Sequence, residues 1–65
     1  MTLKTINEKA NKTIGIEGMT VNERLYVSGL MDVFDRAKKN DIELAKTILK
    51  ALKVDLKSIE KIVKG

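Results

Sequence analysis

Residues 20–40 constrain the fold most, because the apolar residues of TVNERLYVSGLMDVFDRAKKN recur with the period of an α-helix. Thr20 and Glu23 match a capping box, in which each side chain satisfies an exposed backbone N–H at the start of a helix. Two lysines followed by Asn40 are typical of a helix end. At about 100° per residue, one apolar stripe about 120° wide contains Tyr26, Val27, Leu30, Val33, Phe34 and Ala37. The pattern predicts one continuous helix over residues 20–39.

Two further amphipathic segments follow this helix. Asp41 is a suitable cap for a helix over residues 42–52, and Asp55 for a shorter helix over residues 56–63. The short connections favour neighbouring, roughly antiparallel helices. The expected fold class is all-α, a small bundle of three helices with an optional short N-terminal helix. The expected core consists of Tyr26, Val27, Leu30, Val33, Phe34, Ala37, Ile42, Ala45, Ile48, Leu49, Leu52, Ile59 and Ile62.

The N-terminal segment, MTLKTINEKANKTIGIEG, has a weaker pattern than the rest of the chain. Leu3, Ile6 and Ala10 have helical spacing, which predicts a short, marginal helix within residues 3–12. The two glycines of TIGIEG favour an extended turn or a short strand, and a loop is expected after the helix.

Residues 19–38, MTVNERLYVSGLMDVFDRAK, resemble a group of small uncharacterised bacterial proteins that begin close to M-T-V-N-E-R-L. The resemblance implies a small helical fold, and it implies no activity, because no function is established for that group. Beyond about Val54 the likeness ends. The matching residues are 19–25, Gly29, Leu30, Phe34, Asp35 and Ala37.

The resemblance also suggests a division of the chain. Met19 looks like the ordinary start of such a protein, so residues 1–18 are expected to be an added N-terminal lead. Residues 19–65 are expected to form a single helical domain. We therefore expect this domain to fold without residues 1–18.

The chain is short and has none of the usual covalent or metal staples of small domains. A single core in a chain of 65 residues typically supplies only about 3–5 kcal/mol. The sequence has no Cys and no His, which excludes a disulfide and the usual structural zinc sites. Small domains of this kind often gain stability from a second copy or a partner. The composition therefore favours self-association.

The residues for catalysis are largely missing, and the protein is not expected to be an enzyme. Without His or Cys, acid–base and nucleophilic roles fall to Asp, Glu, Lys, Ser or Tyr26. Asp32 and Asp35 share a helix side and could bind a divalent cation, but the basic residues around them favour surface ion pairing. The segment GIEG lacks the lysine and the spacing of a phosphate-binding loop. No cofactor, metal or small-molecule substrate is expected.

Apolar residues outside the main stripe of the predicted helix 20–39 point to a protein interface. Val21 and Leu25 lie on its opposite side and Met31 on one flank, while Gly29 would allow another helix to approach closely. The interface is therefore expected at Val21, Leu25, Gly29 and Met31, with a homodimer or a protein partner. In the alternative interpretation, Val21 and Leu25 hold the preceding loop and Gly29 is merely tolerated.

Nucleic-acid binding is the alternative function, because the whole net charge of +4 comes from residues 46–65. Residues 46–64 match a degenerate helix-turn-helix, in which Lys53, Lys57, Lys61 and Lys64 could contact phosphates. Its apolar positions would be Ile48, Leu52, Val54, Ile59 and Ile62. The expected second helix has no Arg, Asn or Gln for base edges, which predicts weak and unselective binding.

No segment of the sequence has the composition of a signal peptide or a membrane span. The longest apolar runs have three residues, far below the ~20 needed to cross a bilayer. The lysine-rich end has no aromatic anchor for a membrane surface. A cytoplasmic protein that binds no membrane is therefore expected.

Overall fold

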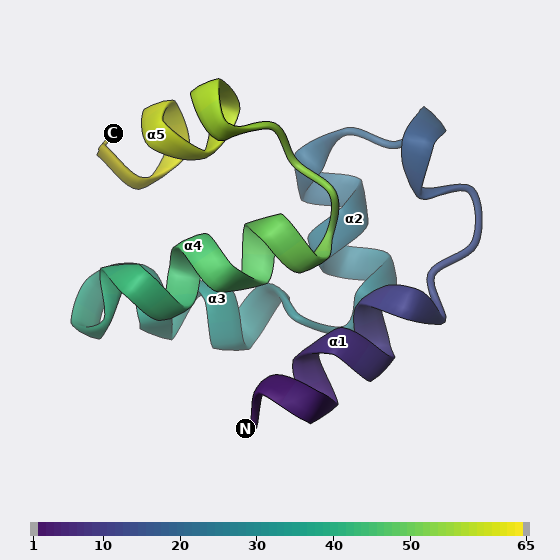
Figure 1. Ribbon diagram of the computed structural model, residues 1–65, viewed down its shortest axis with the longest axis horizontal. Helices are drawn as coiled ribbons and strands as arrows, with labels where there is room; N and C mark the ends of the chain where they lie inside the picture. Colours follow the sequence, from purple (N-terminus) through teal and green to yellow (C-terminus); the bar gives the residue numbers. More distant parts are fainter. Residues whose placement is uncertain (1, 65) are drawn as a thin grey trace.

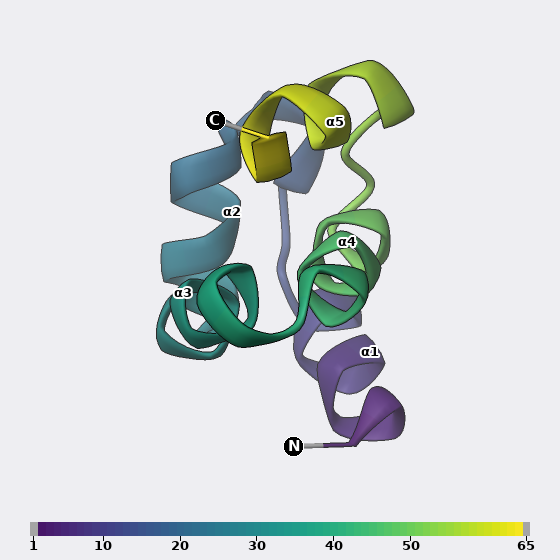
Figure 2. The same ribbon diagram turned by 90° about the vertical axis from the view of Figure 1, so that its left-hand side faces the viewer.

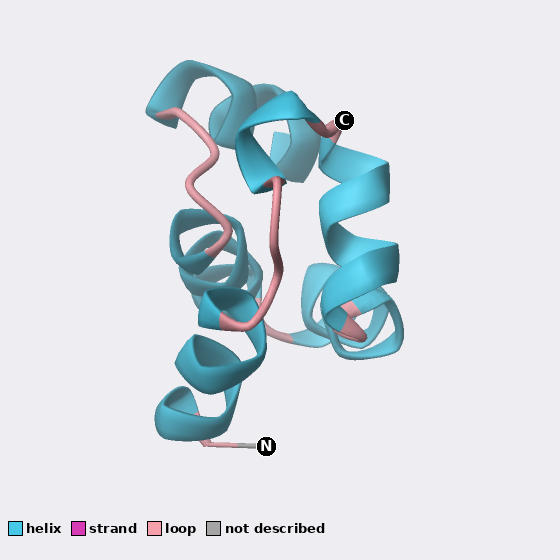
Figure 3. Ribbon diagram, turned by 90° about the vertical axis from the view of Figure 1, so that its right-hand side faces the viewer, coloured by secondary structure: helices cyan, strands magenta, loops and turns pink. Residues whose placement is uncertain are grey.

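The computed structural model describes residues 2–64, and in this range the chain is entirely helix and loop, without a strand (Figures 1 and 3). The predicted all-α class is confirmed, but there are more helices than the three that were expected. The predicted short N-terminal helix is present. The elements are α1 (Leu3–Asn11), the 3-10 turn η1 (Ile16–Gly18), α2 (Val21–Ser28), α3 (Met31–Asn40), α4 (Ile42–Ala51) and α5 (Leu56–Lys64).

The prediction of one continuous helix over residues 20–39 is wrong, because the chain leaves the helix at Gly29 and starts a new one. Gly29 has a φ of +77°, which a residue with a side chain adopts only at a cost. The N–H of Leu30 donates to the carbonyl of Leu25 (3.0 Å), and the N–H of Gly29 donates to that of Tyr26 (3.2 Å). This pair of bonds is the Schellman motif, which ends a helix at a left-handed residue. Leu25 and Leu30, both buried, form its usual apolar pair.

The break at Gly29 also decides which face of α2 points inward. Leu25 is only 2% exposed, whereas Tyr26 is 78% and Val27 55% exposed. The apolar stripe was predicted for one continuous helix, in which residues 26, 27, 30, 33, 34 and 37 share a side. The break at Gly29 changes the direction of the chain, so residues of α2 and α3 no longer share that side. Tyr26 and Val27 are consequently on the surface, and their assignment to the core is wrong.

The core forms around α4, which packs against α1, α3 and α5. Helices α3 and α4 pack side by side, α1 lies against α4 on one side, and α5 covers α4 on the other (Figures 1 and 2). Ile42 was also expected in the core, but it lies at the exposed start of α4 and is 40% exposed. Val33 and Ile62 pack against the core and are partly buried. The buried apolar residues are Ile6, Ala10, Ile16, Leu25, Leu30, Phe34, Ala37, Ala45, Ile48, Leu49, Leu52, Val54 and Ile59.

Residues before Met19 contribute to this same core. Ile6 is fully buried, and Ala10 and Ile16 are nearly so. The side chain of Thr2 accepts a hydrogen bond from the N–H of Thr5 (3.3 Å) and caps α1. Because burial of an isoleucine stabilises a fold by roughly 1.5–3 kcal/mol, we now expect residues 1–18 to be needed for full stability.

Arg24 ties α2 to the end of α4. Its guanidinium donates to the carbonyls of Leu52 and Lys53, both at 3.2 Å, and to that of Met19 at 3.1 Å. The two former carbonyls lie at the C-terminal end of α4, where a positive charge is favourable. The contact holds the inner side of α2 against the bundle, so the opposite side faces outward.

Candidate interaction surfaces

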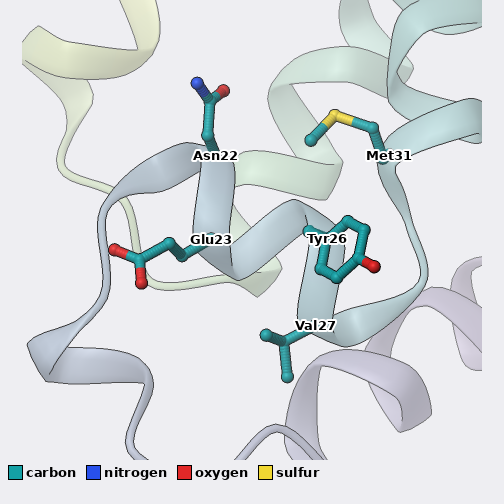
Figure 4. Close-up of a pocket in the computed structure, with 5 residues that line it drawn as sticks. All are labelled: Asn22, Glu23, Tyr26, Val27 and Met31. Atoms are coloured by element: carbon teal, nitrogen blue, oxygen red, sulfur yellow. The ribbon is translucent and has the colours of Figure 1, made fainter.

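The outer face of α2 combines exposed apolar side chains with a hollow. It consists of Asn22, Glu23, Tyr26 and Val27, and Met31 at the start of α3 borders it (Figure 4). These five residues line a shallow, open hollow of about 470 Å³. Met31 is partly buried and its side chain lies toward the side of α2 that carries Tyr26 (Figure 4). We call these five residues the α2 face.

A complete capping box holds the start of the α2 face. The N–H of Thr20 donates to Oε1 of Glu23 (3.1 Å), and the N–H of Glu23 donates to the hydroxyl of Thr20 (3.2 Å). The predicted capping box is therefore confirmed. The backbone hydrogen bond from Thr20, assisted by the Thr20 side chain, lowers the pKa of Glu23, so this carboxylate is charged at neutral pH.

The residues expected to form an interface are only partly available. Leu25, one of the four expected interface residues, lies inside the core, and Val21 is partly buried against the core. Gly29 allows the chain to turn, and within this chain a side-chain carbon there would meet only Lys9 Nζ, at 3.6 Å. Met31 alone borders the exposed surface. The exposed apolar side chains of α2 are instead Tyr26 and Val27, because the break at Gly29 separates the inward side of α2 from that of α3.

The basic residues of the alternative site are all exposed, one in the α4–α5 turn and three along α5. Lys53 has a φ of +63°, the one left-handed residue with a side chain among residues 2–64. The N–H of Lys53 donates to the carbonyl of Lys50 (2.9 Å) and that of Val54 to the carbonyl of Leu49 (3.0 Å), a second Schellman motif. A helix-turn-helix commonly has a glycine at this position of its turn. Lys57, Lys61 and Lys64 lie on α5, exposed.

The apolar skeleton of the proposed helix-turn-helix also lies inside. Ile48, Leu52, Val54 and Ile59 are buried, and Ile62 packs against the core. Asp55 caps α5 by accepting a hydrogen bond from the N–H of Ser58 (3.1 Å). The side chain of Ser58, and then its backbone N–H, lower the pKa of Asp55, which therefore places a negative charge beside the lysines.

The described part of the chain contains neither a cluster of metal ligands nor a helix that could span a membrane. Across residues 2–64 no three carboxylates come together as metal ligands, so Asp32 and Asp35 have no third partner. Each helix in that range falls short of the ~20 apolar residues that a bilayer crossing takes. A comparison with known protein families, curated proteins and solved structures finds no match for this chain.

Proposed function

We propose that the protein is a small helical interaction module that binds a protein partner through the α2 face. The observation that carries this proposal is Tyr26, which is 78% exposed on a firmly capped helix beside the exposed Val27. Tyrosine is enriched at protein interfaces, since it buries a large ring with few rotatable bonds and keeps a polar hydroxyl. The chain has one tyrosine and one phenylalanine, and the tyrosine lies on the surface.

The surroundings of Tyr26 suit a docking site better than the other exposed apolar residues do. Ile14 is 89% exposed, but it lies in a loop between α1 and η1 and is not among the residues that line the hollow at α2. Leu56 is 65% exposed and precedes Lys57 on α5. The α2 face, in contrast, combines an aromatic, an aliphatic and a thioether side chain around one depression.

A photo-crosslinking amino acid placed at position 26 tests the proposal in the cells that make the protein. The matched control carries the same amino acid at Ile14, which is more exposed but outside the α2 face. We expect one discrete, saturable adduct from position 26, absent from position 14 and reduced by Val27→Lys. Mass spectrometry of the adduct then identifies the partner, and binding of the purified partner confirms it.

Two outcomes would contradict the proposal. If position 26 gives no discrete adduct, the α2 face has no stable partner under those conditions. If positions 14 and 26 give the same pattern of adducts, the contacts are unspecific collisions and exposure alone explains them. Either result removes Tyr26 as an interaction residue.

Nucleic-acid binding stays a second candidate, favoured by the left-handed Lys53 in the α4–α5 turn. Lys53 in this turn and Lys57, Lys61 and Lys64 on α5 are exposed, and lysine–phosphate contacts need no particular base sequence. Asp55 and Glu60 lie among them and oppose an anionic ligand. The expected binding is weak and falls steeply with salt.

Selection from a random DNA pool separates the two candidates. We expect no enriched sequence at physiological salt, and only salt-sensitive binding that Lys57→Gln together with Lys61→Gln weakens. A selected sequence that survives physiological salt would show that α4 and α5 read DNA, and it would replace the interaction proposal as the main function.

A further inference from the structure

We infer that the partner of the α2 face is a second copy of this chain, with the two α2 helices packed antiparallel about a two-fold axis. This inference rests on the proposed function and adds the identity of the partner. A two-fold interface uses the same surface on both copies, so the surface must be complementary to itself. The α2 face and the adjoining end of α1 meet that requirement.

The exposed side of α2 consists of two short rows of side chains. Asn22 and Tyr26 form one row and Glu23 and Val27 the other, because residues four apart lie above one another on a helix. In an antiparallel pair, the two-fold axis is perpendicular to the helices, and each row of side chains packs against the same row of the second copy. Tyr26 then lies beside Tyr26 of the second copy, and Val27 beside its equivalent, so both apolar side chains leave water.

The charges around this surface match the antiparallel arrangement. With the axis midway between residues 26 and 27, Glu23 lies at the same height along the helices as residue 30 of the second copy, next to Gly29, because both are equally far from the axis. Lys9 Nζ lies at this end of α2, 3.6 Å from where a side-chain carbon on Gly29 would be. Each Glu23 carboxylate therefore approaches Lys9 of the second copy, and symmetry produces this ion pair twice.

The parallel arrangement fails on the same charges. It would bring Glu23 beside Glu23 of the second copy, and like charges facing each other are unfavourable. The ion pair found within residues 2–64 joins Lys46 and Glu43, and neither Lys9 nor Glu23 has an ionic partner among these residues. Oε1 of Glu23 accepts the capping hydrogen bond from Thr20, and its second oxygen can pair with Lys9 of a second copy.

Charge reversal on the full chain tests the inference by sedimentation equilibrium. We expect wild type to be dimeric at high micromolar concentration and Tyr26→Lys to be monomeric. Lys9→Glu sets two carboxylates against each other at both symmetric contacts, and Glu23→Lys sets two ammonium groups. Since one surface ion pair is worth about 1.4- to 5-fold in association, each reversal is expected to weaken dimerisation by about tenfold or more.

An equimolar mixture of the two variants is the decisive sample. In a mixed dimer both contacts pair opposite charges again, so we expect the mixture to dimerise close to the strength of wild type. Circular dichroism confirms that each variant is folded. If Glu23→Lys unfolds through loss of its cap, Glu23→Gln keeps the cap and removes the charge, and it should weaken dimerisation less than Lys9→Glu does.

Several results would overturn the inference, and they differ from those that overturn the proposed function. A wild type that stays monomeric, or a mixture that stays as monomeric as its components, excludes the antiparallel pairing. A crosslinked adduct from position 26 that contains a different protein excludes the second copy as partner but leaves the α2 face as an interaction surface. Absence of any adduct from position 26 removes both.

Discussion

The role of the N-terminal helix is best tested at Ile6, which is fully buried in the core. Truncation of a buried isoleucine to alanine typically destabilises a protein by about 2–5 kcal/mol. Alanine is the better helix former, and its higher helix propensity offsets about 0.5 kcal/mol of this destabilisation within α1. A domain this small has about 3–5 kcal/mol in total, so Ile6→Ala is expected to leave much of the protein unfolded at 25 °C.

The milder substitution Ile6→Val keeps the variant measurable. Loss of one buried methyl group is expected to destabilise by about 0.5–1.5 kcal/mol, and each kcal/mol lowers the melting temperature of a domain of this size by about 4–8 °C. Leu3→Ala is the matched control, because Leu3 lies one turn away on the same helix and is 58% exposed. We expect it to change stability by no more than about 0.5 kcal/mol.

Urea unfolding followed by circular dichroism at the helical band gives the free energy of unfolding for each variant. The midpoint should fall in the order wild type, Leu3→Ala, Ile6→Val, Ile6→Ala, with an unchanged slope if only stability has changed. Equal midpoints for Ile6→Val and Leu3→Ala would refute the burial argument. A protein that begins at Met19 and keeps the wild-type midpoint would also refute it.

Three further predictions concern individual positions. Lys53→Gly should stabilise the protein by about 0.5–1 kcal/mol, since glycine adopts a positive φ without strain, whereas Lys53→Ala should not. Leu25→Glu should unfold the protein and Tyr26→Glu should leave its circular dichroism unchanged, since Leu25 is 2% and Tyr26 78% exposed. Glu23 and Asp55 have lowered pKa values, so their charged forms stabilise the fold above the ordinary carboxyl pKa. The free energy of unfolding should therefore decrease as pH falls below about 4, and it should decrease less in Glu23→Gln, which lacks one of the two carboxyl groups.

The sequence pattern predicted the elements whose evidence is local. The capping box at Thr20 and Glu23, the caps at Asp41 and Asp55, and the inward faces of α4 and α5 all follow from residue types at fixed spacing. The helix over 3–12 was also predicted, from its apolar spacing, and Thr2 caps it. Local hydrogen bonds and helical periodicity suffice for these features.

The interface prediction placed Leu25 on the outer side of its helix, whereas Leu25 is buried. It treated Gly29 as an interior helix residue, so that Leu25 appeared to be surplus on the outside and Tyr26 inside. A Schellman ending was readable in the sequence, since Gly29 is followed by Leu30 and preceded four residues earlier by Leu25. That signal could have placed Tyr26 on the surface before the structure did.

The sequence by itself determined that this chain is helical, that it has no disulfide, and where most of its helices begin. These properties depend on residues within a turn or two of one another. The tertiary structure alone decided that α2 and α3 have separate phases, that Ile6 and Leu25 share the core, and that Tyr26 faces outward. The reason is that an amphipathic helix does not specify what covers it. A break at Gly29 rotates α2 relative to α3, and the contacts of Arg24 with the end of α4 hold its inner side in place.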